Sequence, residues 1–295
     1  MTENIRIYMH PTARSEHKVQ ARKIRKLLGI EKIHELSFPI EPIPENIDTV
    51  GVYGGDGSVG EVMKSLINRD EPVFLLIGGG GSQNGLLHNL LAEGVILKTE
   101  QIREKDFGSI PDFHPGQVGF ENVTNQYIFH HSLELGDWIN QIIQINDRLR
   151  NSKIPRGFRM FYAVAKYLLV NKDESEFKNE EFRLFFTGNY FGTLKIFSRQ
   201  GLFDNHLTQV VLKNEKRVEM LRKTLRLSAY ILLKKIPPAD IANILRSDKF
   251  TISNSKGSYS LAGIEGEFID ITGRGDIFVS RSERSIKAAA IVFEG

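Results

Sequence analysis

The 295-residue sequence contains no cysteine. This absence excludes disulfide bonds, thiolate metal sites and cysteine nucleophiles, and it fits a reducing compartment. The sequence also has no run of the roughly 18–20 apolar residues that cross a bilayer. Its first residues, MTENIRIYMH, lack the charged start and apolar core of a secretory signal. We therefore expect a cytoplasmic protein that is at most peripherally attached to a membrane.

Several common catalytic signatures are missing as well. No G-x-S-x-G elbow is present, so serine-hydrolase chemistry is unsupported. No H-E-x-x-H spacing is present, and the eight histidines are scattered. His130 and His131 adjoin a predicted strand, where successive side chains point to opposite faces, so we expect no simple chelate from them. These absences remove the usual hydrolases and zinc enzymes from consideration.

The charges are unevenly distributed along the chain. The total is 39 Lys+Arg against 36 Asp+Glu, or +3. Residues 1–150 carry 15 basic and 20 acidic residues, or −5, and residues 151–295 carry 24 and 16, or +8. The hydrophobic share of 41% is that of a folded protein, and the length favours two domains over one. A basic second half indicates an anionic partner.

The first half alternates apolar strand-like segments with amphipathic helical ones. Strands are predicted over 5–10, 49–55 and 72–80, and helices over 15–28, 58–68 and 82–94. Ser58 and Glu61 have the spacing of a capping box. Because the strands are almost wholly apolar, the pattern predicts a parallel sheet covered by helices on both faces.

The second half reads as a β-rich domain that carries helices. One strand-like segment, 125–135, is followed by helices over 137–149 and 157–169. The rest predicts antiparallel strands over 181–192, 193–197 and 207–213, a basic helix over 215–235 and short strands near the C-terminus. The aromatic cluster of Phe185, Phe186, Tyr190, Phe191 and Phe197 is expected in the core, with a lipid-tail pocket as the alternative.

Two glycine-rich segments follow predicted strands. The first is Gly54-Gly55-Asp56-Gly57-Ser58, and the second runs from Gly78 to Gly85. Glycine lets backbone N–H groups approach a phosphate, and a helix N-terminus adds donors and partial positive charge. Asp56 in such a place would bind Mg²⁺ or accept a proton; otherwise it is a solvated residue of a tight turn. Neither segment matches the common dinucleotide or Walker patterns.

Five motifs resemble the diacylglycerol kinase catalytic-domain family, which includes bacterial lipid kinases, sphingosine kinases and ceramide kinase. GGDGS with Glu61 is similar to that family's GGDGT…E signature. The other four, in chain order, are His10–Arg14, GGSQN (80–84), Gly188–Gly192 and Glu265-Gly266-Glu267.

The resemblance implies a nucleotide-binding α/β domain, a β-sandwich domain and an active site in the cleft between them. We place the first domain at 1–124, with 286–295 as a segment that could complete it, and the sandwich at 125–285. The resemblance also implies that the γ-phosphoryl group of ATP moves to a lipid hydroxyl with the help of Mg²⁺. The expected partner is a lipid at an anionic membrane surface and not a nucleic acid, and a homodimer is left open.

The resemblance assigns roles to individual residues. Asp56 is the expected Mg²⁺ ligand or proton-transfer residue, Glu265 the candidate base and Glu267 a supporting carboxylate. Because alternate residues of a strand share a face, both glutamates could point to one site. The expected ATP-binding residues are Thr12, Arg14, Gly54, Gly55, Gly57, Ser58, Glu61, Gly80, Gly81, Ser82, Gln83 and Asn84.

Departures from the family pattern keep alternatives open. Asn84 stands where the family has a second aspartate, and Glu265 replaces an aspartate. The family's Gly-Phe-Asp-Ala motif corresponds to residues 134–137, where the aspartate follows Gly136 and is displaced by one position. Of the acidic cluster that holds a structural Mg²⁺ in some bacterial members of the family, only Asp204 is present. A family member that binds nucleotide or lipid without turnover is therefore one alternative, and an enzyme similar to NAD kinase is another. The basic helix over 215–235 either lies on an anionic membrane or packs on the second domain.

Overall fold

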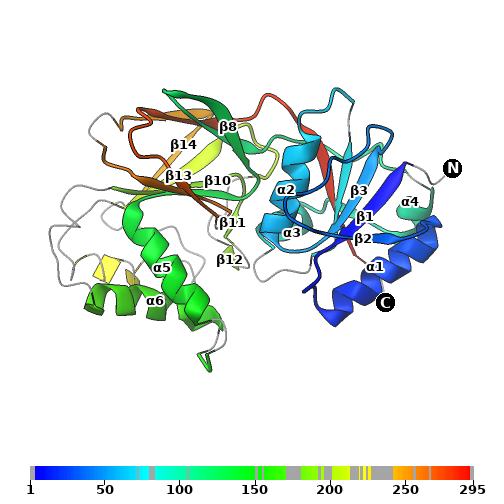
Figure 1. Ribbon diagram of the computed structural model, residues 1–295, viewed down its shortest axis with the longest axis horizontal. Coiled ribbons are helices and arrows are strands. Elements are labelled where there is room, and N and C mark those ends of the chain that lie inside the picture. Colours follow the sequence, from blue (N-terminus) through cyan, green and yellow to red (C-terminus); the bar gives the residue numbers. More distant parts are fainter. Residues whose placement is uncertain are drawn as a thin grey trace.

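The computed structural model describes most of the chain. The described residues are 4–71, 73–79, 84–104, 106–149, 152–154, 156–170, 181–191, 194–195, 201–212, 219, 222–223, 225–226, 242–254, 257–265 and 267–292. Within them the chain forms a seven-stranded mixed sheet, a six-stranded and a four-stranded antiparallel sheet, and a short hairpin. The mixed sheet and the antiparallel sheets lie side by side (Figure 1).

The mixed sheet contains six parallel strands in the order β2-β1-β3-β4-β19-β5, and β6 runs antiparallel beside β19. Its strands are β1 (Ile5–Met9), β2 (Ile33–Glu35), β3 (Thr49–Tyr53), β4 (Phe74–Ile77), β5 (Ile96–Leu97), β6 (Asp112–Phe113) and β19 (Ile286–Ile291). The last strand of the chain thus lies inside the sheet that the N-terminal half begins, between β4 and β5. Figure 1 shows it as the red strand among the blue and cyan ones.

Helices cover both faces of this sheet, as its apolar strands predict. They are α1 (Ser15–Leu28), α2 (Asp56–Leu66), α3 (Gly85–Ala92) and α4 (Thr99–Glu104). One core joins α2 and α3 to the sheet and includes Val52, Met63 and Leu86. The other joins α1 and α4 to the opposite face and includes Ile24 and Ile102. Side chains alternate along a strand, so β1, β3, β4 and β19 each supply both cores.

The two antiparallel sheets pack against each other as a sandwich. The six-stranded sheet has the order β14-β13-β10-β9-β16-β17, and the four-stranded sheet has the order β15-β18-β7-β8. The core between them draws on both sheets, with Leu133 and Phe185 from one and Val118 and Val279 from the other. The strands are β7 (Gly116–Phe120), β8 (Val123–Phe129), β9 (Ser132–Leu135), β10 (Phe182–Phe186), β13 (Leu207–Leu212), β14 (Asn243–Ser247), β15 (Lys249–Ile252), β16 (Leu261–Ile264), β17 (Glu267–Asp270) and β18 (Ile277–Arg281).

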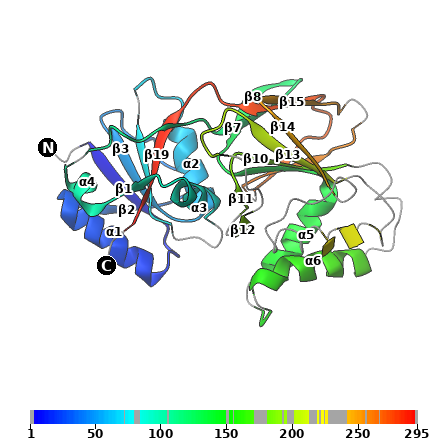
Figure 2. The same ribbon diagram turned by 180° about the vertical axis from the view of Figure 1, so that it is seen from behind.

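Two helices and a hairpin complete the described chain. These are α5 (Asp137–Arg148), α6 (Arg156–Val170) and the hairpin of β11 (Tyr190–Phe191) and β12 (Leu194–Lys195). Figure 2 shows α5 and α6 together on one side of the sandwich. The described part of the chain has no helix that is long and apolar enough to cross a membrane. Most of the basic helix expected over 215–235 lies outside the described residues, so its predicted membrane contact stays a prediction.

Two expectations about the second half were wrong in detail. The segment 125–135 is two strands rather than one, because the chain leaves the four-stranded sheet after β8 and enters the six-stranded sheet at β9. The expected domain boundary after residue 124 falls inside β8, and β7 of the same sheet already begins at Gly116. The pairing of β6 with β19 therefore places the change of sheet between residues 113 and 116.

Candidate active site

The site begins at the carboxyl edge of the parallel sheet. From β1 the chain returns to β2 on one side, and β3 lies on the other side of β1, so the winding direction reverses between β1 and β3. Ligands of open α/β sheets bind at such a reversal. The two loops that leave this point are in contact: the N–H of His10 donates to the carbonyl of Tyr53 at 2.8 Å. The sequence motifs His10–Arg14 and Gly54–Ser58 therefore share one edge.

Helix α2 presents its N-terminus at this edge. Its N-cap, Gly55, is extended, and no side chain caps the helix. A Cβ atom built on Gly57 would have no atom within 4 Å, so open space adjoins the first turn. Uncapped N–H groups beside open space suit an anion. The expectation that Ser58 is the N-cap was wrong, because the helix begins at Asp56 and Ser58 is buried within it.

The N-terminus of helix α3 is capped by a residue that is distant in the sequence. Asn84 precedes the helix in the left-handed region, with φ of 55°. The N–H of Gly85 donates to Asp56 Oδ2 at 2.9 Å, and the N–H of Leu86 lies 3.4 Å from Oδ1. The two glycine-rich segments thus meet, as their neighbouring strands β3 and β4 predict. Gly80, Gly81, Ser82 and Gln83, which were expected to bind ATP, lie outside the described residues.

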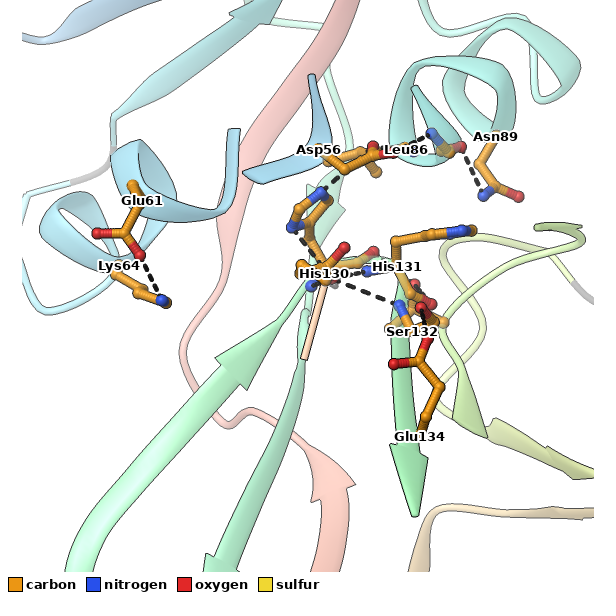
Figure 3. Close-up of polar contacts among 12 residues, drawn as sticks. Asp56, Glu61, Lys64, Leu86, Asn89, His130, His131, Ser132 and Glu134 are labelled. Carbon is orange, nitrogen blue, oxygen red and sulfur yellow. Dashed lines mark hydrogen bonds and ion pairs between the residues drawn. The ribbon is translucent and has the colours of Figure 1, made fainter. Parts of the chain in front are cut away.

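The remaining expected nucleotide-binding residues lie in different surroundings. Thr12 is exposed, and its hydroxyl oxygen lies 2.9 Å from His10 Nδ1. Arg14 is exposed at the start of α1, with its guanidinium 3.7 Å from Glu16. Glu61 is paired with Lys64 one turn along α2, and Figure 3 shows this pair apart from Asp56. Thr12 and Arg14 remain accessible to a ligand at this edge, whereas the Glu61 carboxylate is already paired with a cation.

The opposite side of the site is built by two turns of the sandwich. His130 lies in the turn between β8 and β9 and is fully buried. Its Nε2 lies 3.6 Å from Asp56 Oδ1, and its Nδ1 lies 3.3 Å from Glu265 Oε1. One imidazole ring therefore lies between the carboxylates of Asp56 and Glu265. Figure 3 shows His130 below Asp56.

Glu265 occupies the hairpin turn between β16 and β17. Its backbone is in the left-handed region, with φ of 54°. Its Oε1 accepts the N–H of His131 at 2.7 Å and of His130 at 2.9 Å, and the N–H of Ser132 lies 3.4 Å away. The carboxylate thus orders the β8–β9 turn. Its Oε2 is buried without a hydrogen-bond partner.

The expected alternation of Glu265 and Glu267 on one strand was wrong. Ile264 of β16 pairs with Glu267 of β17, so the chain reverses direction between the two glutamates. The Glu265 side chain is 5% exposed, whereas Glu267 is exposed on the surface. The hairpin turn sends the two carboxylates into different surroundings. The supporting role of Glu267 stays a prediction without a contact that favours it.

Burial and pairing set the charges of the central groups. Burial alone would raise the pKa of Asp56, but the contact with His130 and the N–H of Gly85 hold that pKa far below its usual range. Burial alone would lower the pKa of His130, but the facing carboxylates of Glu265 and Asp56 raise it above the ordinary value. Opposite charges within a few ångströms favour the ionised forms. The contact between the two groups thus favours an ionised Asp56 and strengthens proton binding by His130.

The pKa values of the surrounding groups shift in the directions opposite to those of Asp56 and His130. Burial raises the pKa of Glu265 to about 7, and it raises the pKa of Glu134 to about 8. Glu134 accepts the hydroxyl of Ser132 at 2.9 Å, while its Oε2 has no hydrogen-bond partner. Burial lowers the pKa of His131 to about 4, so this ring is neutral. A carboxyl with a pKa near 7 is suited to exchange a proton at neutral pH.

Polar contacts from neighbouring segments fix the β8–β9 turn. Thr187 donates its hydroxyl to the carbonyl of His130. The buried guanidinium of Arg281 donates to the carbonyls of Thr187 and His114, each at 2.6 Å. Burial lowers the pKa of this guanidinium to about 10. On the other side, the N–H of Asn189 donates to the side-chain carbonyl of Asn89 in α3 at 2.7 Å.

The expected Mg²⁺ site at Asp56 does not fit these contacts. Among the described residues no three His, Cys, Asp or Glu side chains group as metal ligands. Both Asp56 oxygens face N–H groups or the His130 ring. A bound Mg²⁺ needs free oxygen ligands at about 2.0–2.1 Å, and here a nitrogen of the His130 ring lies 3.6 Å from Asp56 Oδ1. Asp204 is likewise paired with an arginine, Arg246, at 2.8 Å.

Sequence reasoning missed three residues of this site. A continuous strand was predicted over 125–135, so the turn that buries His130 and His131 was not expected. Glu134 was considered only as part of the motif that departs from the family pattern near Gly136. His131 packs against the start of α3, where a Cβ on Gly85 would lie 2.5 Å from its ring. The available signal was the pair of adjacent histidines between two apolar segments, which is unusual for a solvent-exposed turn.

Solved structures that share this fold include three from one bacterium. One, from Bacillus anthracis str. Sterne and described as a "putative diacylglycerol kinase", has a TM-score of 0.64 at 14% identity, over 97% of this chain and 96% of that one. A second of the same description has a TM-score of 0.60 at 13% identity, over 97% of both chains. A third, described as a diacylglycerol kinase from the same organism, has a TM-score of 0.59 at 11% identity, over 97% of this chain and 96% of that one.

The sequence itself matches no family model and no curated protein. The structural likeness extends over nearly the whole chain, and the TM-scores are those of a shared fold. The chain therefore has the fold of these bacterial proteins, and its resemblance to diacylglycerol kinases is confirmed at the level of the fold. Activity and substrate belong to the proposal below.

Proposed function

We propose that the protein is an ATP-dependent kinase that transfers the γ-phosphoryl group to a hydroxyl of a diacylglycerol-like or sphingoid lipid. One observation carries the proposal. Asp56 joins the two glycine-rich segments through the N–H groups of Gly85 and Leu86, beside the uncapped N-terminus of α2 and the open space at Gly57. Free N–H groups at the reversal point of a kinase-like fold support a phosphate-binding role for this edge.

The nucleotide phosphates would bind along the carboxyl edge of the sheet. The backbone N–H groups at the start of α2 would hold them, since glycine at 54, 55 and 57 leaves the backbone uncovered. Thr12 and Arg14 are exposed on the adjacent loop and would contact the same anion. Preorganised N–H donors stabilise the charge that develops during phosphoryl transfer.

Glu265 is the candidate base for the acceptor hydroxyl. Its Oε1 is committed to backbone N–H groups, which leaves Oε2 as the oxygen that would accept the hydroxyl proton. A pKa of about 7 allows it to take a proton from the acceptor and release it at neutral pH. The acceptor would enter between the parallel-sheet half and the sandwich, in the cleft that the resemblance implies.

The lipid character of the acceptor rests on two features. The fold is that of proteins described as diacylglycerol kinases. The second half of the chain carries a net +8 (24 basic and 16 acidic residues), which favours approach to an anionic membrane surface. Peripheral membrane attachment in the cytoplasm belongs to this proposal, and no nucleic acid is part of it.

A radiolabel transfer assay tests the proposal directly. The purified full chain, with Mg·ATP labelled at the γ position, is incubated with vesicles that contain diacylglycerol, sphingosine, ceramide or monoacylglycerol, and separately with NAD. We expect label in one lipid class and none in NAD. ATP binding without any lipid product would remove the catalytic half of the proposal, and labelled NADP would show an NAD kinase.

A second candidate function is nucleotide or lipid binding without turnover. Both Asp56 oxygens are engaged, and the Glu265 side chain is 5% exposed, which favours a role in structure over one in chemistry. Asp56→Asn discriminates between the candidates, since the amide oxygen can still accept the N–H of Gly85. In a kinase this variant loses turnover by about 10²-fold or more, whereas in a binding protein it leaves ligand affinity near the wild-type value.

A further inference from the structure

Helix α6 has one buried face and one exposed face. The buried face is formed by Ala163, Val164 and Tyr167. On the other face Tyr162 is 48% exposed, and Leu169 is 74% exposed, more than any other large apolar side chain in the described part of the chain. Lys166 is exposed between them. Because residues three and four apart are neighbours on a helix surface, Tyr162, Lys166 and Leu169 form one stripe.

The stripe lies on the outside of the sandwich half. Helix α6 packs against α5, and α5 in turn contacts strand β16. Figures 1 and 2 show the two helices together, away from the parallel sheet and its helices. The exposed apolar side chains of α6 thus belong to an outer surface of the molecule.

The sequence around the stripe has charge of one sign only. Residues 148–172 contain seven Lys or Arg and no Asp or Glu, and the seven are Arg148, Arg150, Lys153, Arg156, Arg159, Lys166 and Lys172. Of these, Arg148 and Lys153 are exposed like Lys166. Protein surfaces usually mix both signs of charge. An apolar stripe within a segment of cations alone favours an anionic partner.

We propose that the exposed stripe of α6, Tyr162, Lys166 and Leu169, is the surface with which the protein docks on an anionic lipid bilayer. Leu169 enters the boundary between headgroups and acyl chains, and the Tyr162 ring lies at the headgroup level. Lys166 extends its flexible side chain to the lipid phosphates. The proposal deepens the proposed function, on whose lipid acceptor it rests, by naming the surface that meets the membrane.

The choice of a bilayer over a second copy of this chain follows from the charge. A twofold dimer places the same patch of each copy against itself. Such a contact at α6 would bring the cations of 148–172 from both copies together, and like charges repel. A bilayer that contains anionic lipids instead supplies the opposite charge and an apolar boundary for Leu169 and Tyr162.

Sedimentation of the full chain with vesicles tests the proposal without ATP or acceptor. We expect binding to vesicles of phosphatidylcholine with phosphatidylserine and far weaker binding to phosphatidylcholine alone. Leu169→Gln should weaken the binding about tenfold, because a leucine no longer leaves water. Lys166→Gln should weaken it about fivefold through the loss of one cation near the surface. The matched controls, Leu245→Gln and Lys249→Gln, replace exposed residues of β14 and β15 and should leave the binding unchanged.

Three results would overturn the proposal. The first is equal binding of the wild type to the two kinds of vesicle, which needs no variant. The second is binding that survives in Leu169→Gln and is lost in Leu225→Gln, since Leu225 is 50% exposed in the basic helix predicted over 215–235. The third is a dimer that Leu169→Gln dissociates, seen by sedimentation velocity, with vesicle binding unchanged. A protein that binds the vesicles but phosphorylates no lipid would refute the proposed kinase activity and support this docking surface.

Discussion

The two sides of the candidate site offer different kinds of chemical groups. The parallel-sheet side offers backbone N–H groups and open space at Gly57. The sandwich side offers buried ionisable side chains, His130, Glu134 and Glu265, on and beside two turns. Binding can thus depend on the backbone while proton transfer depends on side chains, because N–H donors must be exposed to reach a ligand and strongly shifted pKa values require burial.

Asp56 is the residue at which the two sides meet. It belongs to a glycine-rich segment, yet its carboxylate is buried and faces His130. It contributes to the parallel-sheet side by accepting the N–H groups at the start of α3, and to the sandwich side through its contact with the His130 ring. Substitutions that affect only one side therefore separate the contributions of the two sides.

The largest expected effect separates the two glutamates of the hairpin. Glu265→Gln should lower turnover in the lipid kinase assay by about 10²–10⁴-fold, because it removes the candidate base while keeping an acceptor for the N–H groups of the turn. Glu267→Gln should cause a far smaller loss, since its carboxylate is exposed beyond the turn. Equal losses in the two variants would show that the sandwich side supplies a carboxylate pair and not a single base.

The next effect concerns pH and stability. The folded pKa of Glu134 is about 8, above its ordinary value of 4.5, so the folded state binds this proton more tightly than the unfolded state. The resulting stability is fully present below pH 4.5 and is lost as the pH rises through about 8. His130, whose pKa is also raised, loses its contribution in the same direction, whereas Asp56, whose pKa is lowered, loses its contribution only in acid.

Urea unfolding at pH 5 and pH 8 measures this difference. The wild-type free energy of unfolding should fall by on the order of a few kcal/mol between these values, and Glu134→Gln should reduce that fall. Glu100→Gln is the matched control, since Glu100 is exposed on α4. If the wild type and Glu134→Gln lose stability equally, the sandwich side does not hold a protonated carboxyl group there.

The smallest effect contrasts two glycines, one on each side. A Cβ on Gly57 would meet nothing within 4 Å, whereas a Cβ on Gly263 would lie 2.4 Å from Glu134 Oε2. Gly263→Ala should therefore destabilise the protein by about 1–3 kcal/mol. Gly57→Ala should leave the stability unchanged or raise it by up to about 1 kcal/mol, while weakening ATP binding measured by calorimetry. Unchanged ATP affinity in Gly57→Ala would place the phosphates elsewhere.

The parallel-sheet half could be predicted closely from local patterns. Helix α1 spans the expected residues 15–28, and the strands expected at 5–10, 49–55 and 72–80 are β1, β3 and β4. These elements depend on apolar periodicity and on glycine, which act over short stretches of chain. The start of α2 was misplaced because an extended Gly55 ends the loop earlier than the Ser58 capping pattern indicated.

The sandwich half of the site could not be predicted in the same way. The change of sheet at His130–His131 depends on which strands pair, and the sequence of 125–135 is equally compatible with one continuous strand. The two-residue hairpin between Ile264 and Glu267 depends likewise on pairing. Both decide which side chains are buried, and burial in turn decides their charge.

The sequence by itself therefore excluded cysteine chemistry, indicated a helix-covered parallel sheet and placed two glycine-rich segments after neighbouring strands. It could do so because residue composition and short periodic patterns act locally. Only the tertiary structure decided that Asp56 faces a histidine and not open solvent, that Glu265 is buried while Glu267 is exposed, and that the last strand of the chain completes the first sheet. The physical reason is that charge state and metal binding depend on neighbours distant in sequence, which the fold brings within a few ångströms.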